Sequence, residues 1–193
     1  MVRINMSGVW IMITLTSVGF LLESAVSDSA INGLALWPLQ TGFMPWQLIT
    51  YSFLHANFIH LAFNMYGLWM FGGELESLLG RRVFFQLYFA SVLSAGILQL
   101  LVTRLTGSMY PMVGASGGVF GLLLAYGMCF PNQMIMLLIP PVSLPAWLFV
   151  MLYAVIELML GVTGTQSGVA HFAHLGGMVG GYIIIRRWHR RSW

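Results

Sequence analysis

Residues 171–181 read His-Phe-Ala-His-Leu-Gly-Gly-Met-Val-Gly-Gly, inside an apolar run that extends over about residues 169–185. His171 and His174 are three positions apart, so a helix places both on one face. Gly177 and Gly181 form a G-x-x-x-G pattern, which lets a membrane helix press closely against a neighbour. An ionisable ring inside an apolar helix needs a partner or a function. The segment therefore predicts a close-packed membrane helix whose histidines have a hydrogen-bond partner or a functional role.

The whole chain has the composition of a membrane protein. Of its 193 residues, 59% are hydrophobic and only 7% are charged. A soluble domain of this size has roughly a quarter of its residues charged, so lipid must solvate this surface. The single cysteine, Cys129, rules out an internal disulfide. We expect an all-α, polytopic membrane protein that forms one domain over residues 1–193, with no room for a separate soluble domain.

A helix needs about 20 apolar residues to cross a bilayer. The chain contains several apolar runs that approach this length, and they predict six spanning helices, at about residues 8–22, 51–71, 83–102, 116–130, 144–160 and 169–185. The second helix is expected to end at the Gly72-Gly73 pair. The connection at residues 23–50 contains two tryptophans and two prolines, which suit a segment lying at the outer membrane interface.

The net charge of +3 is distributed unevenly, and all eight basic residues are arginine. With six spans, Arg3, Arg81-Arg82 and the C-terminal arginines fall on one side and Arg104 falls on the other. Because cytoplasmic loops carry an excess of basic residues, we expect both termini to be cytoplasmic. The 23–50 connection, the loop before Ser116 and residues 163–168 then face outward. A nucleic-acid partner is excluded, because it would need a basic face on a soluble fold.

Ser116 lies in the segment Gly114-Ala115-Ser116-Gly117-Gly118, at the expected start of the fourth span. Small neighbours allow a substrate or another backbone to approach closely, and the free N–H groups of a helix N-terminus can stabilise an oxyanion. The same segment also suits plain helix packing. The segment by itself leaves both interpretations open.

A serine hydroxyl needs a base to become a nucleophile. The chain has no lysine, so a Ser-Lys mechanism is excluded and histidine remains. The glycine face that follows His174 would bring its ring to Ser116, while His171 stays a minor alternative as the base. His60 and Asn64, four positions apart and expected midway along the second span, offer side-chain donors for an oxyanion.

Other protease chemistries fit the chain less well. No H-E-x-x-H motif is present, and Asp28 is the only aspartate, so the usual metalloprotease and paired-aspartate mechanisms are excluded. A zinc site made of His60, His171, His174 and Glu157 remains a rival. For Glu157 we favour a hydrogen-bonded structural residue over one that lines a water path, and we assign it no role in the reaction.

Three motifs, in order along the chain, resemble those of the bacterial rhomboid proteases. They are His60-x-x-x-Asn64, Gly114-Ala115-Ser116-Gly117 and Ala173-His174-x-x-Gly177-x-x-x-Gly181. The resemblance covers the chain from about Trp46 to its C-terminus, and it includes the Gly72-Gly73-x-Leu75-Glu76 segment. Each motif is short, but the three together in this order are specific.

The resemblance implies a six-span rhomboid-like bundle and an intramembrane serine endopeptidase with a Ser-His dyad, no aspartate and no cofactor. Ser116 would attack and His174 would act as general base, while His60, Asn64 and the backbone N–H of Ser116 would hold the oxyanion. The fifth span and residues 163–168 would be the gate and cap. Substrates would be single-span membrane proteins with a small-residue, helix-destabilising cleavage site, in the bacterial inner membrane.

Two positions depart from the pattern of that family. Gln47 follows Trp46 where the family often has arginine, so any structural role of that arginine must be met otherwise. Phe120 stands where many bacterial members have a tyrosine that stacks on the histidine, and it keeps the ring but loses the hydroxyl. The alternative function is a non-catalytic rhomboid-like protein that binds client transmembrane helices. Such a protein normally lacks the serine or the histidine, and this chain has both.

Overall fold

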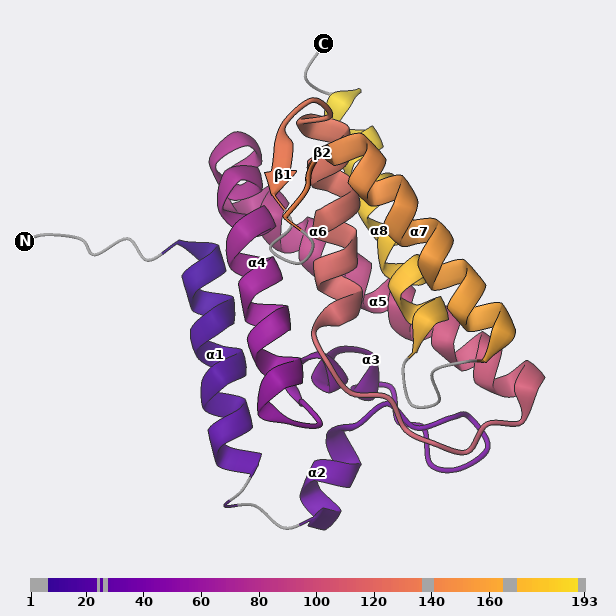
Figure 1. The fold of residues 1–193 in the computed structure, drawn as a ribbon. Coiled ribbons are helices and arrows are strands. Elements are labelled where there is room, and N and C mark those ends of the chain that lie inside the picture. The colour runs from indigo at the N-terminus through magenta and orange to yellow at the C-terminus, as the bar shows by residue number, and fades with distance from the viewer. Residues whose placement is uncertain (1–6, 24, 26–27, 137–140, 165–169, 191–193) are drawn as a thin grey trace, which may run out of the picture.

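The computed structural model describes residues 7–190 except residues 24, 26–27, 137–140 and 165–169. Helices dominate this part of the chain (Figure 1), so the prediction of a helical protein is confirmed. In chain order the elements are α1 (Gly8–Glu23), α2 (Asp28–Leu34), α3 (Gln47–Thr50), the 3-10 turn η1 (Tyr51–Phe53), α4 (Phe58–Leu79), α5 (Arg81–Thr106), α6 (Ser116–Cys129), β1 (Met134–Met136), β2 (Ser143–Pro145), α7 (Ala146–Thr163) and α8 (His171–His189).

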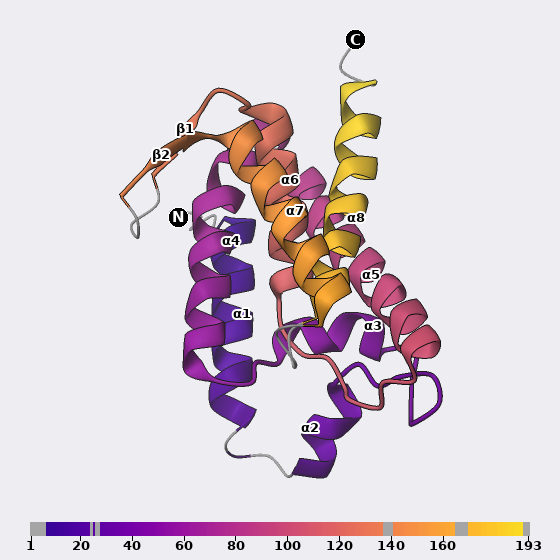
Figure 2. The same cartoon turned by 45° about the vertical axis from the view of Figure 1, so that its right-hand side comes forward.

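The longer helices form a bundle with α5, α6 and α8 at its centre. Helix α8 packs extensively against α5 and α6, α1 packs on α4, and α7 covers α8 and α6 (Figures 1 and 2). The interior is apolar, with Leu68, Phe84 and Leu122 fully buried. Helix α7 is peripheral, and large side chains such as Met151 and Met159 lie exposed on it.

Apolar length differs among these helices. Among the described residues, α5 and α7 are long and apolar enough to cross a membrane by length and composition. Helices α1 and α6 are apolar but shorter, with 16 and 14 residues. Polar residues, including His60 and Asn64 in α4 and His171 and His174 in α8, interrupt the apolar sequence of the other two long helices. The number of membrane spans therefore stays a prediction.

The second predicted helix has different ends from those expected at residues 51 and 71. Helix α4 begins at Phe58, because Asn57 is extended and its side chain accepts a hydrogen bond from the backbone N–H of His60 at 2.9 Å. The Gly72-Gly73 pair does not end the helix. A Cβ on Gly72 would lie 2.9 Å from Val9 Cγ2, so this glycine permits close packing of α1. The helix ends at Gly80, whose φ of 79° is favourable only for glycine.

The connection at residues 23–50 contains two short helices, α2 and α3, in addition to loop. Gln47 is 1% exposed and organises this segment with its side-chain amide. Its Oε1 accepts from the N–H groups of Trp37 and Met44, both at 3.1 Å, and its Nε2 donates to two glycine carbonyls at 3.3 and 3.4 Å. Where rhomboid proteases often have arginine, Gln47 thus holds the connection together by accepting and donating hydrogen bonds.

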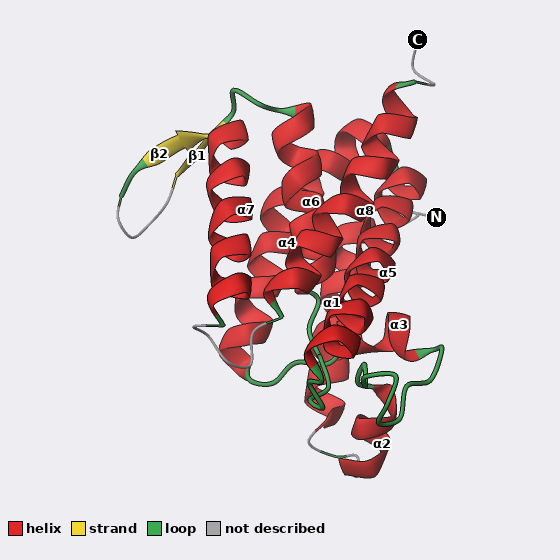
Figure 3. Ribbon diagram, turned by 90° about the vertical axis from the view of Figure 1, so that its right-hand side faces the viewer, coloured by secondary structure: helices red, strands yellow, loops and turns green. Residues whose placement is uncertain are grey.

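The segment between α6 and α7 contains a feature that was not predicted. Strands β1 and β2 form an antiparallel hairpin that pairs Ile135 with Leu144 (Figure 3). The predicted break at Pro131-Asn132 does follow the end of α6 at Cys129. The chain is therefore mostly helical rather than entirely so.

Helix α8 ends at the top of the bundle in Figure 1, whereas α1 begins lower, beside the second half of α4. The Glu76 carboxylate accepts from the N–H groups of Gly8 and Val9, at 2.6 and 2.9 Å, and thereby caps α1. The junction of α4 with Arg81 lies beside this cap, since Arg81 Nε is 3.6 Å from Glu76. Helices α6 and α8 both begin in the lower half of the molecule in this view. Arg3, Arg191 and most of the predicted cap at residues 163–168 fall outside the described residues.

Candidate active site

Ser116 is the first residue of α6 and follows a turn that several elements hold in place. Gly114 has a φ of 123°, and its N–H donates to the carbonyl of Tyr51 at 2.9 Å. The next N–H, of Ala115, donates to His55 Nε2 at 3.4 Å. Burial is the main cause, and the charge interaction with His60 the second, of a pKa of His55 lowered to about 4. The ring is therefore neutral and can accept this bond. The turn thus presents Ser116 at a helix N-terminus, where backbone N–H groups favour negative charge.

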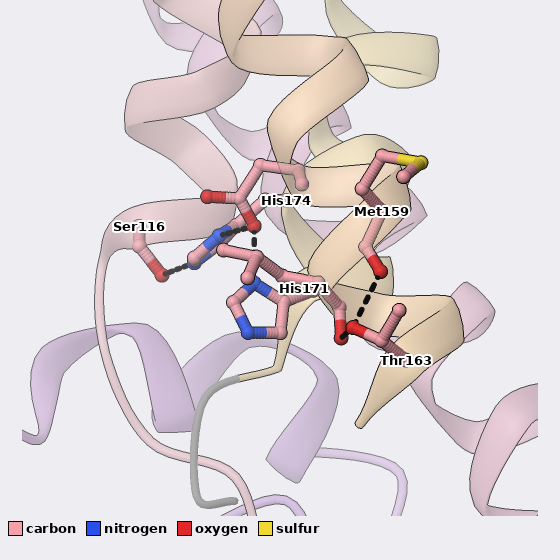
Figure 4. Close-up of polar contacts among 7 residues, drawn as sticks. Ser116, Met159, Thr163, His171 and His174 are labelled. Carbon is pink, nitrogen blue, oxygen red and sulfur yellow. Dashed lines mark hydrogen bonds and ion pairs between the residues drawn. The ribbon is translucent and has the colours of Figure 1, made fainter. Parts of the chain in front are cut away.

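His174 lies opposite Ser116, in the second turn of α8. Its Nε2 is 2.8 Å from Ser116 Oγ (Figure 4). Ser116 is half-buried, so a reactant can reach it, whereas His174 is buried. Two residues 58 positions apart in the chain therefore meet at hydrogen-bond distance.

Backbone contact between α6 and α8 sets this separation. A Cβ on Gly177 would overlap the carbonyl oxygen of Gly117, and a Cβ on Gly181 would lie 2.5 Å from the carbonyl oxygen of Gly121. Glycine at these positions allows the two helices to touch without intervening side chains. The G-x-x-x-G face of α8 thereby places His174 against the start of α6.

Phe120 lies one turn after Ser116 and stacks on the His174 ring, with centroids 4.2 Å apart. Its other neighbour is Tyr153 of α7, at 5.9 Å between ring centroids. Phe120 thus retains the stacking role considered above without needing a hydroxyl.

The two predicted oxyanion residues lie in the first two turns of α4, not midway along it. The His60 ring packs against the turn before the serine, since a Cβ on Gly114 would lie 2.7 Å from His60 Cε1. Asn64 is buried and its Nδ2 donates to the carbonyl of His60 at 2.9 Å. The structure therefore brings His60 beside the turn that precedes Ser116 and places Asn64 one helical turn further on.

Glu157 of α7 belongs to the site, although we assigned it no role from the sequence. Its Oε2 lies 2.8 Å from His174 Nδ1 and 2.7 Å from His171 Nδ1. His171 is therefore bonded to the carboxylate, and the described contacts place His174, not His171, at Ser116 Oγ. The signal in the sequence was an acid in an otherwise uncharged span, together with a histidine pair on another helix that needed partners.

Three residues of the alternative zinc site, Glu157, His171 and His174, do lie close together. The possible ligand atoms of Glu157, His171 and His174 lie within 4.8 Å of one another. Around a tetrahedral zinc with bonds of about 2.0–2.1 Å, ligand atoms are about 3.3 Å apart. The nitrogen–oxygen distances of 2.7 and 2.8 Å are shorter and match hydrogen bonds to a carboxylate. His60 packs on Gly114 and is not in this group, so the geometry favours a hydrogen-bonded carboxylate over a metal centre.

Comparison with known proteins places these residues in a wider context. The model of the family described as the Rhomboid domain matches residues 42–191. The chain is 34% identical over 145 residues to Rhomboid protein 1, mitochondrial, of Saccharomyces cerevisiae, covering 70% of this chain and 40% of that protein. It is 32% identical over 151 residues to Presenilin-associated rhomboid-like protein A, mitochondrial, of Danio rerio, covering 76% and 38%.

A bacterial relative shows similar identity. Rhomboid protease GluP of Bacillus subtilis is 30% identical over 140 residues, which cover 72% of this chain and 25% of GluP. The chain thus spans less than half the length of these three relatives.

Proposed function

Since this chain belongs to the rhomboid family of integral membrane proteins, we propose that it is an intramembrane serine endopeptidase with Ser116 as nucleophile and His174 as general base. The observation that carries this proposal is the 2.8 Å separation of His174 Nε2 and Ser116 Oγ. This is the geometry that a histidine needs to take the proton of an attacking hydroxyl.

The proposed reaction proceeds by acyl transfer. As Ser116 Oγ attacks the scissile carbonyl carbon, its proton passes to His174 Nε2 and the carbonyl π electrons become an oxyanion. The imidazolium then donates that proton to the leaving peptide nitrogen as the C–N bond breaks. A water then attacks the acyl carbon while giving one proton to His174 Nε2. As the bond between that carbon and Oγ breaks, His174 returns the proton to Oγ, which restores Ser116 and releases the second product as a carboxylic acid.

The oxyanion is expected to form at the N-terminus of α6. The backbone N–H of Ser116 and the positive end of the helix dipole favour negative charge there. The His60 ring supplies a further donor beside Gly114. The amide of Asn64 has two N–H bonds, and one of them remains when the other donates to the His60 carbonyl.

The short α6 supports a reaction below the membrane surface. Its 14 residues extend for about 21 Å at about 1.5 Å per residue, whereas the hydrocarbon core is about 30 Å thick. With the Cys129 end at one surface, Ser116 lies roughly 10 Å inside the other. The six longer helices are proposed as the six spans, with both termini cytoplasmic and the site in the outer half of the bilayer.

Substrates of the proposed enzyme are single-span membrane proteins. A half-buried serine within the lipid depth can act on peptide bonds of a transmembrane segment, and small residues that loosen the helix would expose those bonds. We place the protein in a bacterial inner membrane, where Arg81, Arg82 and the arginines at the end of α8 would face the cytoplasm.

Labelling with a fluorophosphonate probe in detergent tests the proposal. The wild type and a matched control, Ser77→Ala on an exposed position of α4, are expected to label. Ser116→Ala and His174→Ala are expected not to label. Equal labelling of all four proteins would contradict the dyad and favour the alternative, a non-catalytic protein that binds client helices. Loss of activity in a chelator would instead favour the zinc site.

A further inference from the structure

Apart from Tyr153, Glu157 is the only residue of α7 with an ionisable side chain, and it is 7% exposed. A carboxylate in the middle of an apolar helix is unfavourable unless partners compensate for its lost hydration. Its partners are two ring nitrogens from another helix, Nδ1 of His171 and Nδ1 of His174, and both contact the same oxygen, Oε2. The position of this acid is therefore matched to the histidine pair.

The hydrogen-bond pattern assigns the protons of the site. An ionised carboxylate only accepts hydrogen bonds, so both Nδ1 atoms must carry the hydrogen. A neutral His174 with its proton on Nδ1 has a lone pair on Nε2. That lone pair faces Ser116 Oγ at 2.8 Å, which is the arrangement a general base requires.

We propose that Glu157 is a positioning residue, which holds His174 in the base-competent tautomer and stabilises the imidazolium formed when Ser116 gives up its proton. This inference rests on the proposed function. The row Ser116–His174–Glu157 corresponds in its hydrogen bonds to a Ser-His-acid triad and not to a dyad alone. The carboxylate stays ionised throughout, while the proton moves from Oγ to Nε2 and then to the leaving nitrogen.

His171 completes the support of the carboxylate. It donates to Glu157 Oε2 from one turn before His174, and its own Nε2 is buried without a hydrogen-bond partner among the described residues. A neutral ring with an unpaired Nε2 is less costly to bury than an ion. His171 therefore fixes the direction of the carboxylate and leaves the contact with serine to His174.

The test compares Glu157→Gln with Glu76→Gln. Glu76 is a second, partly buried carboxylate that accepts hydrogen bonds at the start of α1, away from the site, so its variant controls for the loss of a hydrogen-bonded acid elsewhere in the protein. Glu157→Gln is expected to slow fluorophosphonate labelling by at least about 100-fold, because replacing the acid of a Ser-His-Asp triad by its amide lowers kcat by about 10⁴ through the wrong tautomer. Glu76→Gln is expected to label at the wild-type rate per folded molecule.

The pH dependence of labelling separates positioning from a merely structural role. The groups that face His174 are Glu157 from α7, His171 from α8 itself, Ser116 from α6 and His60 from α4. Removing the anion is expected to change the pH profile of the labelling rate, because a neighbouring negative charge favours the imidazolium over the neutral base. The control should keep the wild-type profile.

A wild-type rate and pH profile in folded Glu157→Gln would overturn the inference while leaving the proposed function intact. Failure of the proposed function has another signature, equal labelling of wild type and Ser116→Ala. If Glu157→Gln does not fold, NMR of wild-type protein with isotope-labelled histidine decides, with the His174 signal identified from His174→Ala. A proton on Nδ1 supports the inference, and a neutral ring protonated on Nε2 overturns it.

Discussion

The ring of Phe120 lies flat on the imidazole of His174, with centroids 4.2 Å apart and 4° between the planes. Phe120 is four residues after Ser116 on the same helix, so one turn of α6 contacts the histidine twice, through the serine hydroxyl and through the ring face. The stack limits rotation of the imidazole about its bond to Cβ.

Loss of this stack should slow the reaction without abolishing it. A stacked aromatic pair contributes about 0.5–1.5 kcal/mol, so we expect Phe120→Ala to lower the labelling rate by roughly 3- to 10-fold. Phe120→Tyr keeps the ring and should stay close to wild type. The measurement is the rate of fluorophosphonate labelling of folded protein, and an alanine variant as fast as wild type would show that the stack does not hold His174.

Substitution of Gly177 should separate the two halves of the site. A Cβ at this position overlaps the carbonyl oxygen of Gly117, and backbone cannot rotate away as a side chain can. Overpacking of this kind costs about 1–3 kcal/mol, so Gly177→Ala is expected to lower Tm in detergent and to reduce labelling, and Gly177→Val more so. Gly73→Ala is the matched control, because nothing lies within 4 Å of its added Cβ. Equal melting of the Gly177 and Gly73 variants would contradict the helix contact.

Gly114 offers a test of the turn before the serine. An alanine there would be strained at a φ of 123° and would place its Cβ 2.7 Å from His60 Cε1. We expect Gly114→Ala to displace His60 and to lower labelling by about 100-fold, the effect of losing one oxyanion donor. Gly42→Ala has a comparable positive φ, 147°, but no neighbour within 4 Å. If the two variants are equally active, the His60 contact has no role in the reaction.

Gln47 should be essential for the order of the 23–50 connection. Gln47→Leu leaves two partly buried N–H groups, those of Trp37 and Met44, without their acceptor. An unsatisfied buried group costs about 1–3 kcal/mol, and partial burial makes the cost smaller, so we expect a lower Tm and faster proteolysis within this connection. Gln47→Arg should also destabilise, because a guanidinium donates and cannot accept.

Gln86→Leu, on an exposed position of α5, is the matched control for these changes and should melt like wild type. The connection also bears on the site, since Leu36 and Met112 exchange backbone hydrogen bonds at 3.0 and 2.9 Å, four residues before Ser116. Unchanged proteolysis of Gln47→Leu would mean that the connection is ordered by other contacts.

Local signals explain which parts of the fold could be predicted from the sequence. Apolar runs and their flanking breaks located α1 and α6 to within a residue at either end, because Glu23 and Pro131-Asn132 mark clear changes of polarity or backbone freedom. The start of α4 was misplaced, since the residues from Tyr51 to Phe53 are apolar but form a separate 3-10 turn. Composition cannot distinguish a buried turn from the first turn of a helix.

In the candidate site, too, some contacts could be predicted from a local pattern and others could not. The proximity of Ser116 and His174 followed from a glycine pattern that has a direct steric meaning. Glu157 was not assigned, because its distance from His174 depends on how α7 lies along α8, and no short motif encodes that register. Gln47 likewise bonds to backbone groups of a loop whose path the sequence pattern does not specify.

The origin of the carboxylate has a consequence for when the site is active. Ser116 and His174 belong to helices that touch through their backbones, where Gly177 meets Gly117 and Gly181 meets Gly121. Glu157 comes from α7, the peripheral helix, and reaches His174 only while α7 is seated. Sideways displacement of α7 would leave serine and histidine together yet remove the anion that assigns the imidazole its proton. The tautomer of His174 would then depend on where α7 lies, and hydrolysis would require α7 to be packed against α8.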